Sequence, residues 1–197
     1  MTNNFVPRLI FSFLFSLFLF QNLTAEINWS IPQDGNKIIL IRHASAPGGG
    51  DPKGFNLDDC KTQRNLDKTG IEQSKKIGML FKVKKIPIDK VLTSQWCRCK
   101  DTAKYAFENY NEFSALNSIF QSPFDKNEDK QLKQIREFVD SWQGNGKNLI
   151  MITHFSIIAK VTNSTPSSGE IIIVNKNFKI LERISTLEMG FFYQKKK

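Results

Sequence analysis

Only two histidines occur in the 197-residue chain, and both follow the same kind of segment. His43 comes after the apolar run IILI and Arg42, and His154 comes directly after NLIMIT. Short continuous runs of branched apolar residues are typical of parallel strands that are buried on both faces. In such sheets the binding site lies beyond the carboxyl ends of the strands. The two imidazoles are therefore predicted to meet at one edge of a sheet.

A third segment, TSQWCRCKDTA (93–103), brings a second arginine to that edge because it follows another predicted strand. Ser94 is predicted to cap the next helix. Arg98 lies in the first turn of that helix, where free backbone N–H groups and the helix dipole favour an anion. Arg42 and Arg98 each present a planar fork that fits pairs of phosphate oxygens. Together with the two histidines they indicate a site for a phosphoryl group.

Strand and helix patterns alternate along the rest of the chain. Strands are expected at 37–41, 90–94, 114–120, 148–153, 170–174 and 178–184, the last two joined by a hairpin-like turn. Helices are expected from a capping box at Thr69–Glu72, over 96–110, over 132–142 and after His154. This order predicts an α/β protein, a three-layer α/β/α sandwich around a mostly parallel sheet.

The N-terminal segment has a different character. Arg8 is the only charged residue before position 26, and an apolar run at 9–20 follows, which is too short for a comfortable membrane span. A basic start, an apolar middle and a short polar end closing on Ala25 form the pattern of an export signal. Residues 1–25 are predicted to be a cleaved signal peptide, with an uncleaved N-terminal anchor as the alternative. Residues 26–197 then form one domain, exported and periplasmic.

The formal net charge of +9 favours anionic partners, such as phosphorylated small molecules, lipid head groups or nucleic acid. The sequence has no arginine-rich run interleaved with aromatic residues, so nucleic acid is not expected. We expect a small phosphomonoester or a phosphorylated glycan as the partner. The terminal lysines at 195–197 add a candidate peripheral contact with an anionic membrane surface. The sequence does not indicate an oligomeric state.

Three cysteines, Cys60, Cys97 and Cys99, cannot all pair within the chain. Cys97 and Cys99 are too close in sequence for an easy bridge to each other, and Cys60 has either of them as a candidate partner. The chain has no Cys-x-x-Cys or His-x-x-x-His spacing, so no metal site is expected.

Four motifs together resemble the histidine phosphatase superfamily, which has the phosphoglycerate-mutase-like fold. They are LIRHA at 40–44, QRNLDKTG at 63–70, the Ser94–Ala103 segment with Arg98 and Thr102, and ITH at 152–154. The resemblance extends from about 37 to 174. Ala44 and Thr153 stand where the family usually has glycine. SSGE at 167–170 resembles an exported branch, the lipopolysaccharide core heptose phosphate phosphatases.

The resemblance implies a mechanism in which His43 attacks phosphorus and becomes phosphohistidine. A neutral nucleophilic imidazole needs an acceptor for its other nitrogen, for which a backbone carbonyl of the Gly48–Gly50 loop is a candidate. Arg42, Arg98 and His154 would hold the phosphoryl oxygens, and water would release phosphate. No metal or other cofactor is implied.

The proton donor for the leaving group is not fixed by the sequence. Asp125 in SPFDKNED and Glu170 in SSGE are the two candidates. Arg64 could either reach the substrate or brace a loop, and Ser45 is a further candidate for substrate binding.

The predicted function is an exported phosphomonoester phosphatase, acting on an envelope sugar phosphate. The alternative from another class is a catalytically weak phospho-ligand binding module. A mutase is disfavoured because it needs a larger lid than this chain provides.

Overall fold

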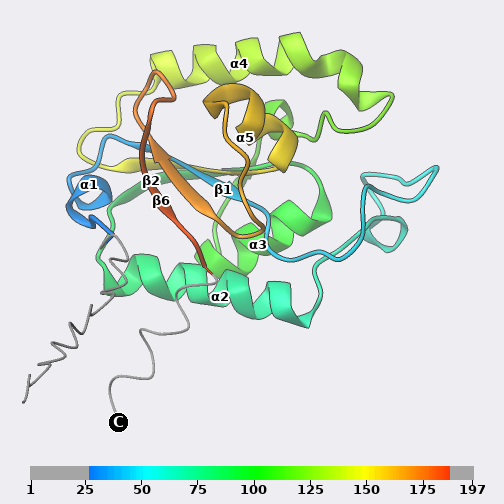
Figure 1. Cartoon of the computed structure of the whole chain (residues 1–197), viewed down its shortest axis with the longest axis horizontal. Helices are drawn as coiled ribbons and strands as arrows, with labels where there is room; N and C mark the ends of the chain where they lie inside the picture. The colour runs from blue at the N-terminus through cyan, green and yellow to red at the C-terminus, as the bar shows by residue number, and fades with distance from the viewer. Residues whose placement is uncertain (1–26, 187–197) are drawn as a thin grey trace, which may run out of the picture.

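Six strands form one sheet in the computed structural model, which describes residues 27–186 (Figure 1). The sheet order is β3-β2-β4-β1-β5-β6. The strands are β1 (Ile38–Arg42), β2 (Ile88–Thr93), β3 (Asn111–Glu112), β4 (Asn148–Thr153), β5 (Ile171–Val174) and β6 (Ile180–Ile184). The first four of these pair in parallel, and β5 and β6 add two antiparallel strands. The predicted mostly parallel sheet is confirmed.

Helices cover both faces of this sheet (Figure 1). On one face α4 (Glu128–Ser141) and α5 (Phe155–Thr162) pack in one apolar cluster with Ile38 and Leu40 of β1. On the other face α2 (Lys68–Val83) and α3 (Cys97–Phe107) pack with the alternate residues, Ile39 and Ile41. Successive side chains of a strand point to opposite faces, so a continuous apolar strand is buried on both. The three-layer sandwich is therefore as the sequence predicts.

Several smaller elements complete the described chain. A one-turn helix, α1 (Ser30–Gln33), precedes β1. The 3₁₀ helices are η1 (Cys60–Thr62), η2 (Ser114–Leu116) and η3 (Phe124–Asn127). The long connection from β1 to α2 extends away from the sheet (cyan in Figure 1). It carries η1 and begins directly after His43.

The start of α2 differs from the predicted capping box at Thr69–Glu72. Asp67 is the residue before the helix, and its carboxylate accepts the backbone N–H of Gly70 at 2.7 Å. The helix thus begins two residues earlier than predicted, because aspartate is at least as good a cap as threonine. A side chain at Gly70 would place its Cβ 2.1 Å from the carbonyl oxygen of Ser45. Glycine therefore lets α2 lie against the segment that follows His43.

The predicted strand at 114–120 is wrong. The segment forms η2 and then crosses the carboxyl edge of the sheet without strand pairing. Its carbonyls are satisfied by side chains instead. The Gln131 amide donates to the carbonyls of Ala115 and Asn117, and the Thr153 hydroxyl donates to that of Leu116. These bonds replace a strand ladder, so Ala115, Leu116 and Ile119 are buried without a sheet, whereas Phe120 at the end of the segment is exposed.

The predicted signal peptide at 1–25 and the lysines at 195–197 lie outside the described residues. Between residues 27 and 186, no helix has both the length and the apolar character needed to cross a membrane.

Candidate active site

The two histidines lie side by side at the carboxyl edge of the sheet. Arg42 at the end of β1 pairs in register with Thr153 at the end of β4, and the His43 N–H donates to the Thr153 carbonyl at 2.9 Å. His43 and His154 follow these two strand ends directly. Their ring centroids are 5.5 Å apart in an edge-to-face arrangement. Parallel pairing of β1 with β4 therefore brings together two residues that are far apart in sequence.

The hydrogen bond of His43 fixes which ring nitrogen is free. Nδ1 lies 2.8 Å from the carbonyl oxygen of Ala44. A carbonyl oxygen only accepts, so Nδ1 carries the proton and Nε2 keeps its lone pair. The acceptor is thus the residue next in sequence and not a carbonyl of the Gly48–Gly50 loop, which was the candidate from the sequence.

Burial and nearby positive charge keep His43 neutral. The residue is 2% exposed. Burial and then the guanidinium of Arg98 lower the pKa of His43 well below its usual 6.5. At neutral pH the ring is therefore the uncharged form, with Nε2 available as a nucleophile.

His154 is held between a hydroxyl and a guanidinium. Its Nε2 is 2.8 Å from Ser94 Oγ, and its Nδ1 is 3.4 Å from Nη2 of Arg98. Because a guanidinium only donates, Nδ1 is the acceptor and Nε2–H donates to Ser94. Burial and then Arg98 lower the pKa of His154 well below 6.5 as well.

The predicted helix-capping role of Ser94 is wrong. Helix α3 begins at Cys97, and Trp96 is its N-cap residue with no side-chain cap. The Ser94 hydroxyl accepts the Trp96 N–H at 3.3 Å and donates to Asn117 Oδ1 at 3.2 Å. Ser94 therefore orients His154, because β2 ends one residue before it at the same edge of the sheet.

Two arginines converge on the histidines with unused donors. Arg98 lies in the first turn of α3 and is 2% exposed, and Arg42 donates from Nη1 to the Pro166 carbonyl at 2.9 Å. The Nε atoms of both are buried without a hydrogen-bond partner among residues 27–186. Buried charged donors are normally paired, so this arrangement is suited to an anionic ligand with several oxygens.

A cavity of about 140 Å³ opens beside these groups. It is lined by Arg42, Gly48, Gly49, Gly50, Asp51, Arg64, Arg98, Ser118, Phe120, Gln121, His154, Phe155 and Ser156. Phe120 and Phe155 are 65% and 38% exposed and form its apolar rim.

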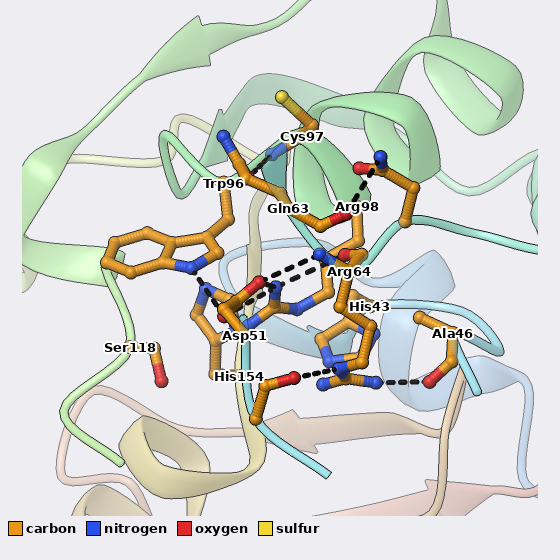
Figure 2. Close-up of polar contacts among 12 residues, drawn as sticks. His43, Ala46, Asp51, Gln63, Arg64, Trp96, Cys97, Arg98, Ser118 and His154 are labelled. Carbon is orange, nitrogen blue, oxygen red and sulfur yellow. Dashed lines mark hydrogen bonds and ion pairs between the residues drawn. The ribbon is translucent and has the colours of Figure 1, made fainter. Parts of the chain in front are cut away.

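Asp51 is the residue of this site that the sequence analysis missed. Its carboxylate accepts Nη1 of Arg98 at 2.8 and 3.1 Å, the indole N–H of Trp96 at 3.0 Å and the backbone N–H of Arg64 at 3.0 Å. Figure 2 shows the carboxylate between Trp96 and Arg98. The available signal was its place directly after the Gly48–Gly50 loop. A cluster of buried arginines also calls for a buried acid.

The fold of this chain is similar to that of several solved structures. No protein-family model and no curated protein matches the chain. Among solved structures, the protein histidine phosphatase SixA in complex with tungstate is 13% identical and aligns with a TM-score of 0.52 over 78% of this chain and 99% of SixA. Phosphoglycerate mutase from Thermus thermophilus is 12% identical, with a TM-score of 0.54 over 76% of this chain and 98% of the mutase. The chain has the phosphoglycerate-mutase-like fold.

A proposed alpha-ribazole-5′-phosphate phosphatase from Escherichia coli shares this fold. It is 15% identical, with a TM-score of 0.54 over 76% of this chain and 96% of that protein. At these identities the likeness concerns the phosphoglycerate-mutase-like fold and not the reaction.

Arg64 braces the rim of the cavity. Its Nε donates to the Gly50 carbonyl at 3.0 Å and its Nη1 to the Ala46 carbonyl (Figure 2). It also lines the cavity, and burial followed by Arg98 lowers its pKa. Ser45 does not line the cavity; its backbone N–H donates to Gln73 at 2.9 Å. Of the two predicted substrate contacts, the structure thus brings only Arg64 to the site.

Neither predicted proton donor lines the cavity. Asp125 is exposed on η3, and its carboxylate accepts the backbone N–H of Lys126. Glu170 is 6% exposed, pairs with Arg183 at 2.7 Å and accepts the Ser167 N–H at 2.7 Å. Its carboxylate thus binds two partners away from the cavity.

Cys60 and Cys97 form a disulfide, with their Cα atoms 5.7 Å apart. This selects one of the two pairings left open by the sequence. The bridge ties η1 to the first turn of α3, one residue before Arg98. The remaining Cys99 is buried, which raises the pKa of its thiol to about 12. Among the described residues, no cluster of histidine, cysteine and carboxylate side chains is suited to a metal ion.

Proposed function

We propose that the protein is a phosphomonoester phosphatase that acts through a phosphohistidine at Nε2 of His43. The single observation that carries this proposal is the buried, neutral His43, whose Nδ1 is committed to Ala44 and whose ring lies beside His154 and close to the charges of Arg98 and Arg42. An unpaired imidazole nitrogen beside unpaired guanidinium donors provides a nucleophile and a phosphoryl clamp together.

In the first step Nε2 of His43 donates its lone pair to phosphorus, and the bond from phosphorus to the ester oxygen breaks. The unpaired Nε–H groups of Arg42 and Arg98 would bind the phosphoryl oxygens as the bond order changes. In the second step water attacks phosphorus, the phosphorus–nitrogen bond breaks, and inorganic phosphate leaves. The net reaction consumes one water and gives an alcohol and phosphate.

His154 would change its charge when the phosphoryl group binds. In the unliganded site three arginines are close to it, and their positive charge helps to lower its pKa. A phosphoryl dianion offsets that charge, and it therefore favours a proton on Nδ1. The protonated ring could then donate to a phosphoryl oxygen in place of accepting from Arg98.

The basicity of the leaving group affects how fast this site can hydrolyse a substrate. Within residues 27–186, Asp51 is the one carboxylate that lines the cavity, and Arg98 already holds it. A positioned acid typically contributes about 10²–10⁴-fold when the leaving group is a basic alkoxide. We therefore expect an aryl phosphate, whose leaving group is weakly basic, to be hydrolysed faster than an alkyl phosphate of equal size, a class that includes sugar phosphates.

The test is phosphate release from an aryl phosphate by the native chain and by His43→Ala. We expect release to fall by at least about 10³-fold in the variant, and acid-labile phosphate to be trapped on the native protein alone. Asp58→Asn, an exposed change in the same β1–α2 connection, is the control. If His43→Ala releases phosphate as fast as the native chain, the assignment is wrong.

Export to a periplasm-like compartment and an envelope sugar phosphate as substrate are part of the proposal. The signal-like pattern at 1–25 supports export, and the Cys60–Cys97 disulfide suits an oxidising compartment. Fractionating bacteria that express the full chain, and a chain lacking residues 1–25, tests the location. Recovery of both in the cytoplasm contradicts it. A phosphate-release screen over phosphorylated sugars, nucleotides and lipopolysaccharide core fragments tests the substrate class.

A phospho-ligand binding module is the second candidate, because the only carboxylate lining the cavity within the described chain is held in an ion pair. This function predicts saturable binding of phosphorylated sugars with negligible turnover. Robust turnover of any natural phosphomonoester would contradict it.

A further inference from the structure

We propose that Asp51 sets the charge of the phosphoryl site, so that the site binds a dianion yet releases inorganic phosphate after turnover. The inference rests on the proposed function, because it takes a phosphoryl group as the ligand. It assigns to Asp51 a role in substrate charge selection and product release, which are distinct from nucleophilic attack and leaving-group protonation.

The Asp51 side chain is built into the site. It is 3% exposed, as is the side chain of Arg98 to which it binds. Its carboxylate receives donors from Arg98, Trp96 and Arg64, and its own backbone N–H donates to Gln121 Oε1 at 3.0 Å. Contacts with separate segments of the chain thus hold this residue at the cavity wall (Figure 2).

Asp51 occupies only one side of the Arg98 guanidinium. Both of its bonds to Arg98 go to Nη1, while Nη2 lies against His154 and Nε is buried without a partner among residues 27–186. The Nε–H therefore remains for one oxygen of a ligand, and Nη2 is released for a second oxygen when His154 takes up a proton and no longer accepts from it. Asp51 and a bound phosphoryl group would then share one guanidinium, with two like charges close together in a poorly solvated site.

The net charge of the side chains at the cavity supports this role. Arg42, Arg64 and Arg98 line the cavity with three positive charges, and Asp51 contributes one negative charge, while both histidines are neutral. Before a ligand binds the sum is +2, the complement of a phosphoryl dianion, and a proton taken up by His154 on binding makes it +3. Without Asp51 each sum is one charge higher, and phosphate would be held more tightly. Coulomb attraction at an effective dielectric constant of about 20 makes one such charge worth tenfold or more in affinity.

Asp51→Asn is the decisive variant because it removes the charge and keeps an oxygen that can accept from Arg98. The probes are tungstate and perrhenate, two tetrahedral oxyanions of charge −2 and −1, with binding measured by titration calorimetry. We expect Asp51→Asn to bind tungstate about 10- to 100-fold more tightly than the native chain. The matched control, Asp58→Asn, removes an exposed carboxylate from the same connection and should leave both affinities unchanged.

Comparing the fold-change in tungstate affinity with that in perrhenate affinity separates an effect of charge from an effect of altered structure. A Coulomb term scales with the charge of the ligand, so the fold-change for tungstate should be about the square of that for perrhenate. A purely structural role would change both affinities by the same factor, and this result would overturn the proposal. Weaker tungstate binding by Asp51→Asn would overturn it too, since Asp51 would then serve only to hold Arg98. If Asp51→Asn does not fold, Asp51→Ser gives the same comparison with a smaller acceptor.

Turnover provides an independent readout. With an aryl phosphate, Asp51→Asn should lower both KM and kcat, and inorganic phosphate should inhibit it at lower concentration than it inhibits the native chain. If the native protein binds tungstate as expected but hydrolyses no phosphomonoester, the proposed function fails while the role of Asp51 stands. If the native protein does not bind tungstate, the inference about Asp51 is wrong.

Discussion

A hydrogen bond from a tryptophan indole to an aspartate occurs at each of the two edges of the central sheet, in different surroundings. At the carboxyl edge the indole N–H of Trp96 donates to Asp51 at 3.0 Å, and at the amino edge that of Trp142 donates to Asp89 at 2.9 Å. The Asp51 side chain is 3% exposed and paired with Arg98, whereas Asp89 is exposed. Asp51 therefore takes part in a buried network of charges, whereas Asp89 is in contact with solvent.

The size of a hollow does not distinguish these edges. The hollow beside Asp89 and Trp142 has a volume of about 330 Å³, against about 140 Å³ for the cavity beside Asp51. The smaller one has the neutral His154 and two arginines with unpaired guanidinium donors at its wall, and the larger one has neither a histidine nor an arginine among its lining residues. Concentrated ionisable groups mark a candidate site better than volume does.

The largest expected contrast between the edges is in catalysis. Arg98→Ala at the carboxyl edge should lower kcat/KM for an aryl phosphate by about 10²–10³-fold or more, because it removes a preorganised donor to the phosphoryl group. Arg136→Ala, which removes an exposed arginine of α4 that binds the Lys176 carbonyl, should leave kcat/KM unchanged. Equal effects of the two substitutions would contradict a site at the carboxyl edge.

Alanine substitutions in the core near the two ends of β4 should lower the stability by similar amounts but differ in their effect on activity. Leu149 and Ile152 are both fully buried, near the amino and carboxyl ends of the strand. Replacing either with alanine should lower the free energy of unfolding by about 2–5 kcal/mol, as measured in urea. Ile152→Ala should also lower kcat, because collapse around the new cavity would shift the Ile152 carbonyl, which accepts the Ser94 N–H beside His154. A loss of kcat in Leu149→Ala but not in Ile152→Ala would contradict this difference.

The disulfide stabilises the carboxyl edge alone. Cys60→Ser should lower the free energy of unfolding by about 2–4 kcal/mol, since the bridge joins residues 37 positions apart in sequence. It should also raise KM, because η1, which lies in the same connection as Asp51 and Arg64, loses its covalent tie to α3. Reductant should affect the native chain in the same way and leave Cys60→Ser unchanged. An effect of reductant on the variant would show that the bridge is not its target.

The neutral histidines predict a loss of stability in mild acid. The folded pKa of each is lowered well below the unfolded value of about 6.5. Below pH 6.5 the unfolded chain therefore binds more protons than the folded chain, and stability falls as the pH falls. The slope is about 1.4 kcal/mol per pH unit for each histidine. Urea unfolding of the native chain at pH 7.5, 6.5 and 5.5 measures this slope. His43→Asn should halve it, because one of the two buried histidines is removed. Equal slopes for the variant and the native chain would show that His43 does not contribute.

The sequence predicted what depends on local patterns and on the general geometry of parallel sheets. Continuous apolar runs located β1, β4 and β5, and the rule that sites lie beyond the carboxyl ends of strands brought His43 and His154 together. Asp51 was missed because its partner Arg98 is 47 residues away and no periodic pattern connects them. The strand predicted at 114–120 failed for a related reason. The side chains of Gln131 and Thr153, remote in sequence, satisfy its carbonyls.

The smallest expected effect is at the amino edge, and it provides the control for the charge role of Asp51. Asp89→Asn removes the same type of charge from the same type of indole contact. A single exposed hydrogen bond contributes little, so the free energy of unfolding should fall by no more than about 1 kcal/mol. Tungstate affinity should not change, because no buried arginine of the described chain shares this carboxylate. If Asp89→Asn tightened tungstate binding as much as Asp51→Asn, the effect of Asp51 would reflect the net charge of the whole protein and not the charge of the site.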